Sequence, residues 1–207
     1  MIKIKNLSFG YGDRIVISKL STEIKSGTVT AIVGRNGAGK SSLLSAIAGD
    51  IGAFEGDIHL SGREIKSLTA SDLASIRSLA QQSHSYWMAY TAREILLLGN
   101  EKVSAERMTY LAKALELNDF LDQSITTLSG GQLQRIEIAR AFARELPMVL
   151  LDEPFASQDI ASIKRIKELI LAEKTRGVTI VLVDHARDED LAWCDYVIDL
   201  DLTSHAQ

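Results

Sequence analysis

The chain has 207 residues, 46% of them hydrophobic, so it is long enough to bury the core of a large domain. A net charge of −4 without a basic tract disfavours nucleic acid as a main partner. The single cysteine excludes an internal disulfide, and no apolar run is long enough to span a membrane. We expect a cytoplasmic protein, because the first residues also lack the pattern of a signal peptide.

The first third of the chain alternates short apolar segments with turns, which is typical of strands. The segment Val29–Val33 is apolar throughout and predicts a buried strand that leads into a glycine-rich loop. Ser71 is the expected N-cap of a short helical turn. The elements expected here are strands at 2–8, 15–24, 29–33 and 57–60 and helices at 41–48 and 71–75.

The middle of the chain has helical spacing and no convincing strand, and apolar strands return after it. The expected helices are at 91–98, 105–117, 131–144 and 159–174, and the expected strands at 149–151, 178–183 and 196–200. Strands separated by helices imply parallel pairing with right-handed crossovers. We predict one α/β domain over residues 1–207, with a core at 1–81 and 146–207 and an inserted helical lobe at 82–145.

The most informative segment is the loop Gly34–Ser42, which reads Gly-Arg-Asn-Gly-Ala-Gly-Lys-Ser-Ser. Its glycines let the backbone turn N–H groups inward, and the following helix start adds a partial positive charge. Lys40 can reach the β- and γ-phosphates of a nucleotide, and the Ser41 hydroxyl can bind Mg²⁺. The alternative is a glycine-rich helix start without a ligand. The predicted nucleotide-binding residues of the loop are Gly34, Asn36, Gly37, Gly39, Lys40, Ser41 and Ser42.

Two carboxylates, Asp152 and Glu153, end the apolar segment at 147–151. Ligands of a parallel sheet gather at the carboxyl ends of its strands, where the glycine-rich loop also lies. We therefore expect Asp152 to hold Mg²⁺, directly or through water, and Glu153 to act on an attacking water as a general base. An exposed acidic turn is the alternative for this segment taken alone.

A second glycine-rich helix start lies at Leu128–Gln132, with Ser129 as its expected cap. It is a second potential anion site or, alternatively, an ordinary capped helix start. Together with the glycine-rich loop, the two carboxylates and His185, it has the order and spacing of ATP-binding cassette (ABC) ATPases. The chain resembles this family from about residue 2 to 200. The resemblance implies Mg²⁺-dependent ATP hydrolysis by an α/β P-loop NTPase core with a mostly parallel sheet, an N-terminal antiparallel β region and an inserted helical lobe.

The resemblance assigns roles to further residues. Tyr11 matches the aromatic residue that stacks on adenine, and a tyrosine facing the core is the alternative. Gln81 resembles the glutamine that senses Mg²⁺ and the attacking water, and Gln82 competes for the same assignment. His185 resembles the histidine that contacts the γ-phosphate. The residues that match the signature segment, which contacts ATP on the opposite subunit, are Ser129, Gly130, Gly131 and Gln132.

The same resemblance implies a symmetric head-to-tail dimer with two ATP molecules at the interface. Hydrolysis would remove the γ-phosphate contacts and release the two halves. One departure lies at the expected subunit contact, because Ala156-Ser157-Gln158-Asp159 replaces the usual Ser-Ala-Leu-Asp. Gln158 therefore stands where the family usually has leucine.

The implied partners are integral membrane transporter subunits, which the protein would bind peripherally at the cytoplasmic face of the cell membrane. An aromatic segment predicts a docking surface for them, and packing inside the helical lobe is the alternative. Its residues are Tyr86, Trp87, Met88 and Tyr90.

Residues 6–12 and 91–99 are similar to those of importers for iron chelates, haem and vitamin B12. An exporter subunit and a soluble family member that remodels nucleic acid or ribosomes are alternatives. A non-hydrolysing ATP-binding regulator is a third alternative, which the presence of Glu153 and His185 disfavours.

Overall fold

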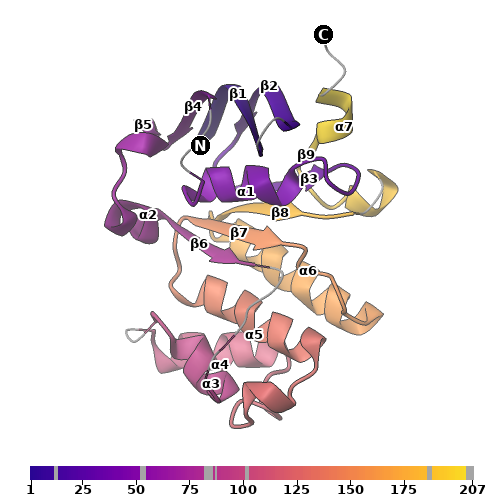
Figure 1. The fold of residues 1–207 in the computed structure, drawn as a ribbon. Coiled ribbons are helices and arrows are strands. Elements are labelled where there is room, and N and C mark those ends of the chain that lie inside the picture. Colours follow the sequence, from indigo (N-terminus) through magenta and orange to yellow (C-terminus); the bar gives the residue numbers. More distant parts are fainter. Residues whose placement is uncertain are drawn as a thin grey trace.

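A five-stranded parallel sheet lies at the centre of the molecule (Figure 1). The computed structural model describes residues 1–11, 14–51, 55–81, 86, 88–100, 103–185 and 188–203, without the side chains of 11, 14, 188, 189 and 203. In spatial order, the strands are β6 (Arg77–Ala80), β7 (Met148–Asp152), β8 (Thr179–Val183), β3 (Val29–Val33) and β9 (Tyr196–Asp199). Every neighbouring pair is parallel, so the carboxyl ends of all these strands meet at one edge.

An antiparallel sheet covers one face of this central sheet, with helix α1 (Lys40–Ala48) between the two (Figure 1). Its strands, in spatial order, are β2 (Arg14–Ile24), β1 (Ile2–Tyr11), β4 (Glu55–Leu60) and β5 (Arg63–Glu64). Leu43 and Ile47 of α1 share one apolar core with Leu150 and Val181 of the central sheet. Burial at about 25 cal/mol per Å² of apolar surface makes this core a main source of stability.

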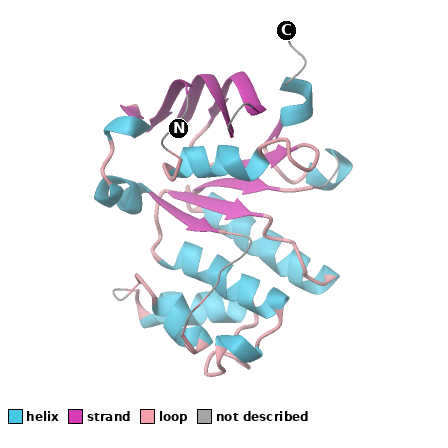
Figure 2. Cartoon of the chain, in the orientation of Figure 1, coloured by secondary structure: helices cyan, strands magenta, loops and turns pink. Residues whose placement is uncertain are grey.

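Helices cover the opposite face of the central sheet, as Figure 2 shows. They are α3 (Ala92–Leu97), α4 (Ala105–Ala114), α5 (Gly130–Ala143) and α6 (Ile160–Thr175). A second apolar core lies between these helices and the sheet. Val149 and Leu151 of β7 point into it, whereas the alternate residue Leu150 points into the core around α1. The helices between β6 and β7 therefore pack on the sheet through a continuous apolar core, and the division into core and lobe stays a prediction.

Short elements complete the chain: η1 (Ile65–Ser67), α2 (Ala70–Ile76), η2 (Ile125–Thr127), η3 (Asp188–Leu191) and α7 (Leu200–Thr203). Within the described ranges, no helix has both the length and the apolar character needed to cross a membrane.

The predicted fold class is confirmed, with a parallel sheet, an N-terminal antiparallel sheet and helices between β6 and β7. Strand β6 was not predicted, because its polar residues Arg77 and Ser78 hide the apolar pattern. They reach partners inside the fold, since Arg77 Nε donates to the Ala48 carbonyl and Ser78 Oγ to the Ala141 carbonyl. Ser71 as an N-cap was wrong, because Thr69 caps α2 through a reciprocal capping box.

Candidate nucleotide-binding site

The loop after β3 has the backbone shape that a phosphate site needs. Gly34, Gly37 and Gly39 have positive φ angles of 146°, 80° and 94°. A Cβ on Gly39 would lie 2.5 Å from Cγ1 of Val16, so only glycine fits between the loop and β2. Helix α1 begins at this glycine without a side-chain cap and without an acidic residue in its first turn. The helix start therefore offers free N–H groups and a partial positive charge to an anion.

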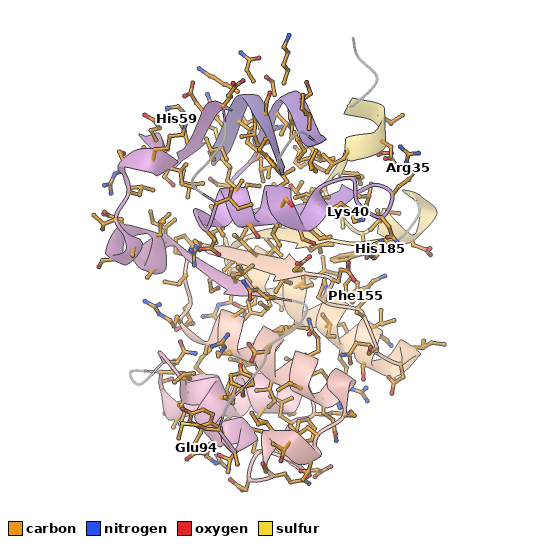
Figure 3. All side chains as sticks on the ribbon, viewed as in Figure 1. Arg35, Lys40, His59, Glu94, Phe155 and His185 are labelled. Atoms are coloured by element: carbon orange, nitrogen blue, oxygen red, sulfur yellow. The ribbon has the colours of Figure 1, made fainter. Side chains whose placement is uncertain are left out.

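Lys40 lies within this loop, and its residue is only 5% exposed. Its Nζ donates to the carbonyl oxygens of Gly34, at 2.9 Å, and of Arg35, at 3.1 Å. The ammonium group is thus held against the backbone of the loop that it would serve. Figure 3 shows Lys40 and His185 on the same side of the molecule.

Ser41 and Asp152 meet although 111 positions separate them in the sequence. The Ser41 hydroxyl donates to Asp152 Oδ1 at 3.0 Å. Burial raises the pKa of Asp152, while the hydrogen bond from Ser41 and the charge of Lys40 act in the opposite direction. A hydroxyl beside a carboxylate is an oxygen donor set of the kind that Mg²⁺ prefers.

Gln81 is exposed directly after β6, and Ala80 pairs with Leu151 in the parallel ladder. Gln81 therefore belongs to the same sheet edge as Asp152. The competing residue, Gln82, lies outside the described residues, so both assignments of the sensing glutamine stay predictions.

Glu153 and His185 form a contact between the ends of β7 and β8. Glu153 Oε1 lies 2.7 Å from His185 Nε2. Glu153 has a φ of 49°, uncommon for a residue with a side chain, and its N–H donates to the Val183 carbonyl at 3.2 Å. The backbone N–H of His185 donates to Asp184 Oδ1 at 2.6 Å. A carboxylate and an imidazole in contact can share and move a proton, which general base catalysis requires.

The signature segment begins helix α5 with a capping box. The Ser129 N–H donates to Gln132 Oε1 at 2.8 Å, and the Gln132 N–H donates to Ser129 Oγ at 3.2 Å. Ser129 is thus the helix cap that the sequence predicted, while the anion role of this segment stays a prediction. Because α5 and α1 lie on opposite faces of the central sheet, the two predicted anion sites belong to different layers of one chain.

A contact that sequence analysis missed joins the signature segment to the loop after Glu153. Gln158 Nε2 donates to the Gly131 carbonyl at 3.0 Å. A Cβ on Gly131 would lie 2.6 Å from the Ser157 carbonyl oxygen, so the two backbones pack tightly. The only sequence signal was glutamine in the place of the family's leucine. It marks the position but not the partner.

We expect the Gln158→Leu substitution to lower the free energy of unfolding by about 1 kcal/mol, the net value of one lost hydrogen bond. Urea denaturation followed by circular dichroism would measure it. Gln123→Leu is a matched control, because Gln123 Nε2 donates to the nearby Asp119 carbonyl on an exposed surface. Equal effects of the two substitutions would contradict a specific role for the contact with Gly131.

The remaining sequence assignments have mixed outcomes. The backbone of Tyr11 pairs with Arg14 at the end of β1, but its side chain is not described, so its adenine role stays a prediction.

The Tyr86 hydroxyl donates to the buried carboxylate of Glu137, and burial, with that contact, raises the pKa of Tyr86. Tyr90 packs edge-to-face on Tyr86, with ring centroids 6.4 Å apart.

The predicted docking surface is therefore divided. Tyr86 and Tyr90 pack against the helical core, as the alternative proposed, whereas Met88 is 62% exposed. Trp87 lies outside the described residues.

Comparisons with known proteins identify the family of the chain. Residues 17–156 match the family model described as ABC transporter. The hemin import ATP-binding protein HmuV of Rhodococcus jostii is 31% identical over 92% of this chain and 68% of its own length. The petrobactin import ATP-binding protein YclP of Bacillus subtilis is 32% identical over 97% of this chain and 83% of its own length.

Solved structures of the same kind superpose well. The dimeric structure of MJ0796, a bacterial ABC transporter cassette, has a TM-score of 0.83 and 27% identity, covering 97% of this chain and 95% of that one. A post-hydrolysis dimer of the same cassette with ADP and Pi gives a TM-score of 0.81 at 27% identity, covering 96% and 94%. The chain therefore belongs to the ABC transporter family, as one of its nucleotide-binding ATPases coupled to transport.

Proposed function

We propose that the chain is the ATP-hydrolysing subunit of an importer for an iron chelate, haem or cobalamin. The observation that carries the ATPase part is the meeting of Ser41 with Asp152 beside the buried Lys40, next to the contact between Glu153 and His185. The import part is supported by relatives named for the import of hemin, petrobactin and iron hydroxamate. An exporter subunit is the less favoured alternative.

Each residue of the site would have its own role in ATP hydrolysis. Lys40 would donate the third N–H of its ammonium group to a phosphate oxygen, because the Gly34 and Arg35 carbonyls accept the other two. Glu153 would accept a proton from the attacking water. His185 would hold that carboxylate and contact the γ-phosphate. Mg²⁺ fits the oxygen donors of Ser41 and Asp152, with Gln81 at the same edge, and would neutralise phosphate charge there.

The signature segment would act on a second copy of the chain. Since α5 and α1 lie on opposite faces of the central sheet, a head-to-tail pair is the arrangement that lets Ser129–Gln132 reach the ATP of the partner. The dimeric cassettes among the similar structures support this proposal. Integral membrane subunits would bind the pair peripherally at the cytoplasmic face, with exposed Met88 as a candidate contact.

Uptake in the host organism tests the proposed import. A strain without the chain should lose uptake of one of the three cargo classes, and the wild-type chain should restore it. The Lys40→Ala variant should not, because transport needs ATP. Accumulation of radiolabelled ferric chelate, haem or cobalamin over minutes is the measurement. Unchanged uptake of all three cargoes without the chain would contradict the proposed substrates, and a defect in efflux would favour the exporter.

A further inference from the structure

The C-terminal turn of the described chain contacts the glycine-rich loop Gly34–Ser42. Helix α7 follows β9, and its Asp201 accepts two hydrogen bonds from Arg35. The Arg35 backbone N–H reaches Oδ2 at 2.9 Å, and the guanidinium Nε reaches Oδ1 at 3.2 Å. Figure 3 shows Arg35 beside this C-terminal helix. Both carboxylate oxygens are thus used on one residue of the loop.

The same residue of the loop also holds Lys40. The carbonyl oxygens of Gly34 and Arg35 accept the hydrogen bonds of Lys40 Nζ. Arg35 is therefore fixed at its N–H by Asp201 and at its carbonyl by Lys40. A movement of the Arg35 backbone would shift both contacts together.

Packing keeps this part of the loop from relaxing. A Cβ on Gly34 would lie 3.2 Å from Cβ of Ala38 and 3.4 Å from Cβ of Leu200. Leu200 is itself 1% exposed, so the turn that carries Asp201 is anchored in the core. The N–H of Asp201 donates to Asp199 Oδ1 at 2.8 Å, which sets the direction of the turn.

The charges indicate that the contact between Arg35 and Asp201 serves to orient the backbone of the loop and not to attract a phosphate. A carboxylate beside a loop that binds polyphosphate repels the ligand, and the Arg35 guanidinium compensates for that repulsion. The Arg35 side chain is 82% exposed, so the ion pair alone contributes little. The hydrogen bond from the backbone N–H of Arg35 is the part that can orient the loop.

We propose that Asp201 is a positioning residue for ATP binding. It holds the Arg35 backbone in the orientation in which the Gly34 and Arg35 carbonyls receive Lys40, so the C-terminal turn sets the affinity of the loop for phosphate. This inference rests on the proposed role of Lys40 in binding ATP.

The Asp201→Ala variant should bind MgATP about three- to tenfold more weakly and show the same rise in KM, because a charge-assisted hydrogen bond is lost. Its kcat should fall less than its affinity, because Lys40 is kept and the contact between Glu153 and His185 lies at the ends of other strands. Asp201→Asn keeps an oxygen that can accept the Arg35 N–H, so it should restore most of the affinity. Leu202→Ala is the control on the same turn, because Leu202 is 74% exposed.

Isothermal titration calorimetry and steady-state phosphate release on the full chain measure these effects. Wild-type affinity in Asp201→Ala, with loss of binding in Lys40→Ala, would overturn the inference and leave the proposed site intact. Full binding in Lys40→Ala would instead overturn the proposed site. Equal losses in Asp201→Ala and Leu202→Ala would overturn the inference as well, because they would show that the turn has only a structural role. If Asp201→Ala does not fold, Asp201→Ser provides the same comparison.

Discussion

Replacing Glu153 by glutamine is expected to reduce ATP turnover by a factor of about 10² to 10⁴, the usual effect of losing a general base. Glutamine has the same shape as glutamate and can still pair with His185, which lies 2.7 Å from the Glu153 carboxylate. It cannot accept a proton at neutral pH. Binding of MgATP should therefore remain while hydrolysis slows by that factor, and calorimetry and phosphate release measure the two separately.

The matched control is Glu94→Gln. Glu94 belongs to the capping box of α3 in the helical part of the molecule, far from Lys40 and His185 in Figure 3. Glutamine preserves the capping box, so turnover should stay at the wild-type level. Equal turnover in wild type and Glu153→Gln would show that another group is the base.

The same variant tests assembly, because it should hold ATP without cleaving it. If ATP joins two copies head to tail, Glu153→Gln should change from monomer to dimer when MgATP is added. Multi-angle light scattering would measure a doubled mass, and ADP provides the control without the γ-phosphate. An unaltered mass in saturating ATP would contradict the proposed dimer.

The site was predictable from sequence to the extent that it lies at strand ends. Asp152 and the loop around Lys40 each follow a buried apolar strand, and parallel strands bring such ends to one edge. The sheet order was not predictable, because β6 carries polar residues that find partners only in the folded chain. Local sequence patterns thus predicted a nucleotide site at the strand ends, whereas tertiary contacts, which the sequence does not reveal, determine which strands are neighbours.

Contacts between distant loops were beyond sequence analysis for the same reason. The bond from Gln158 to Gly131 joins residues 27 positions apart, and that from Arg35 to Asp201 spans 166 positions. Neither has a local pattern, because a surface glutamine or aspartate is usually solvated. The capping box of Ser129 and Gln132 is the opposite case, since its partners are three residues apart and the spacing alone indicates it.

Replacing Lys40 by alanine should weaken MgATP binding by a factor of about 10 to 100 or more, because hydrogen bonds to a charged group contribute roughly 1.5–3 kcal/mol each. Turnover should be lost altogether, since the lysine would also stabilise charge in the transition state. The fold should survive, because removing a buried ammonium group offsets the loss of its bonds to the Gly34 and Arg35 carbonyls.

The control is Lys164→Ala, whose ammonium pairs with Glu168 on an exposed face of α6 and whose side chain is 78% exposed. It removes the same charge from the chain without touching the loop, so it separates a local contact from a general change in net charge. Calorimetric titration at two ionic strengths should give unchanged affinity for Lys164→Ala and the large loss for Lys40→Ala at both. ATP affinity that survives Lys40→Ala would contradict the role of the loop, and the nucleotide site would then have to lie elsewhere in the chain.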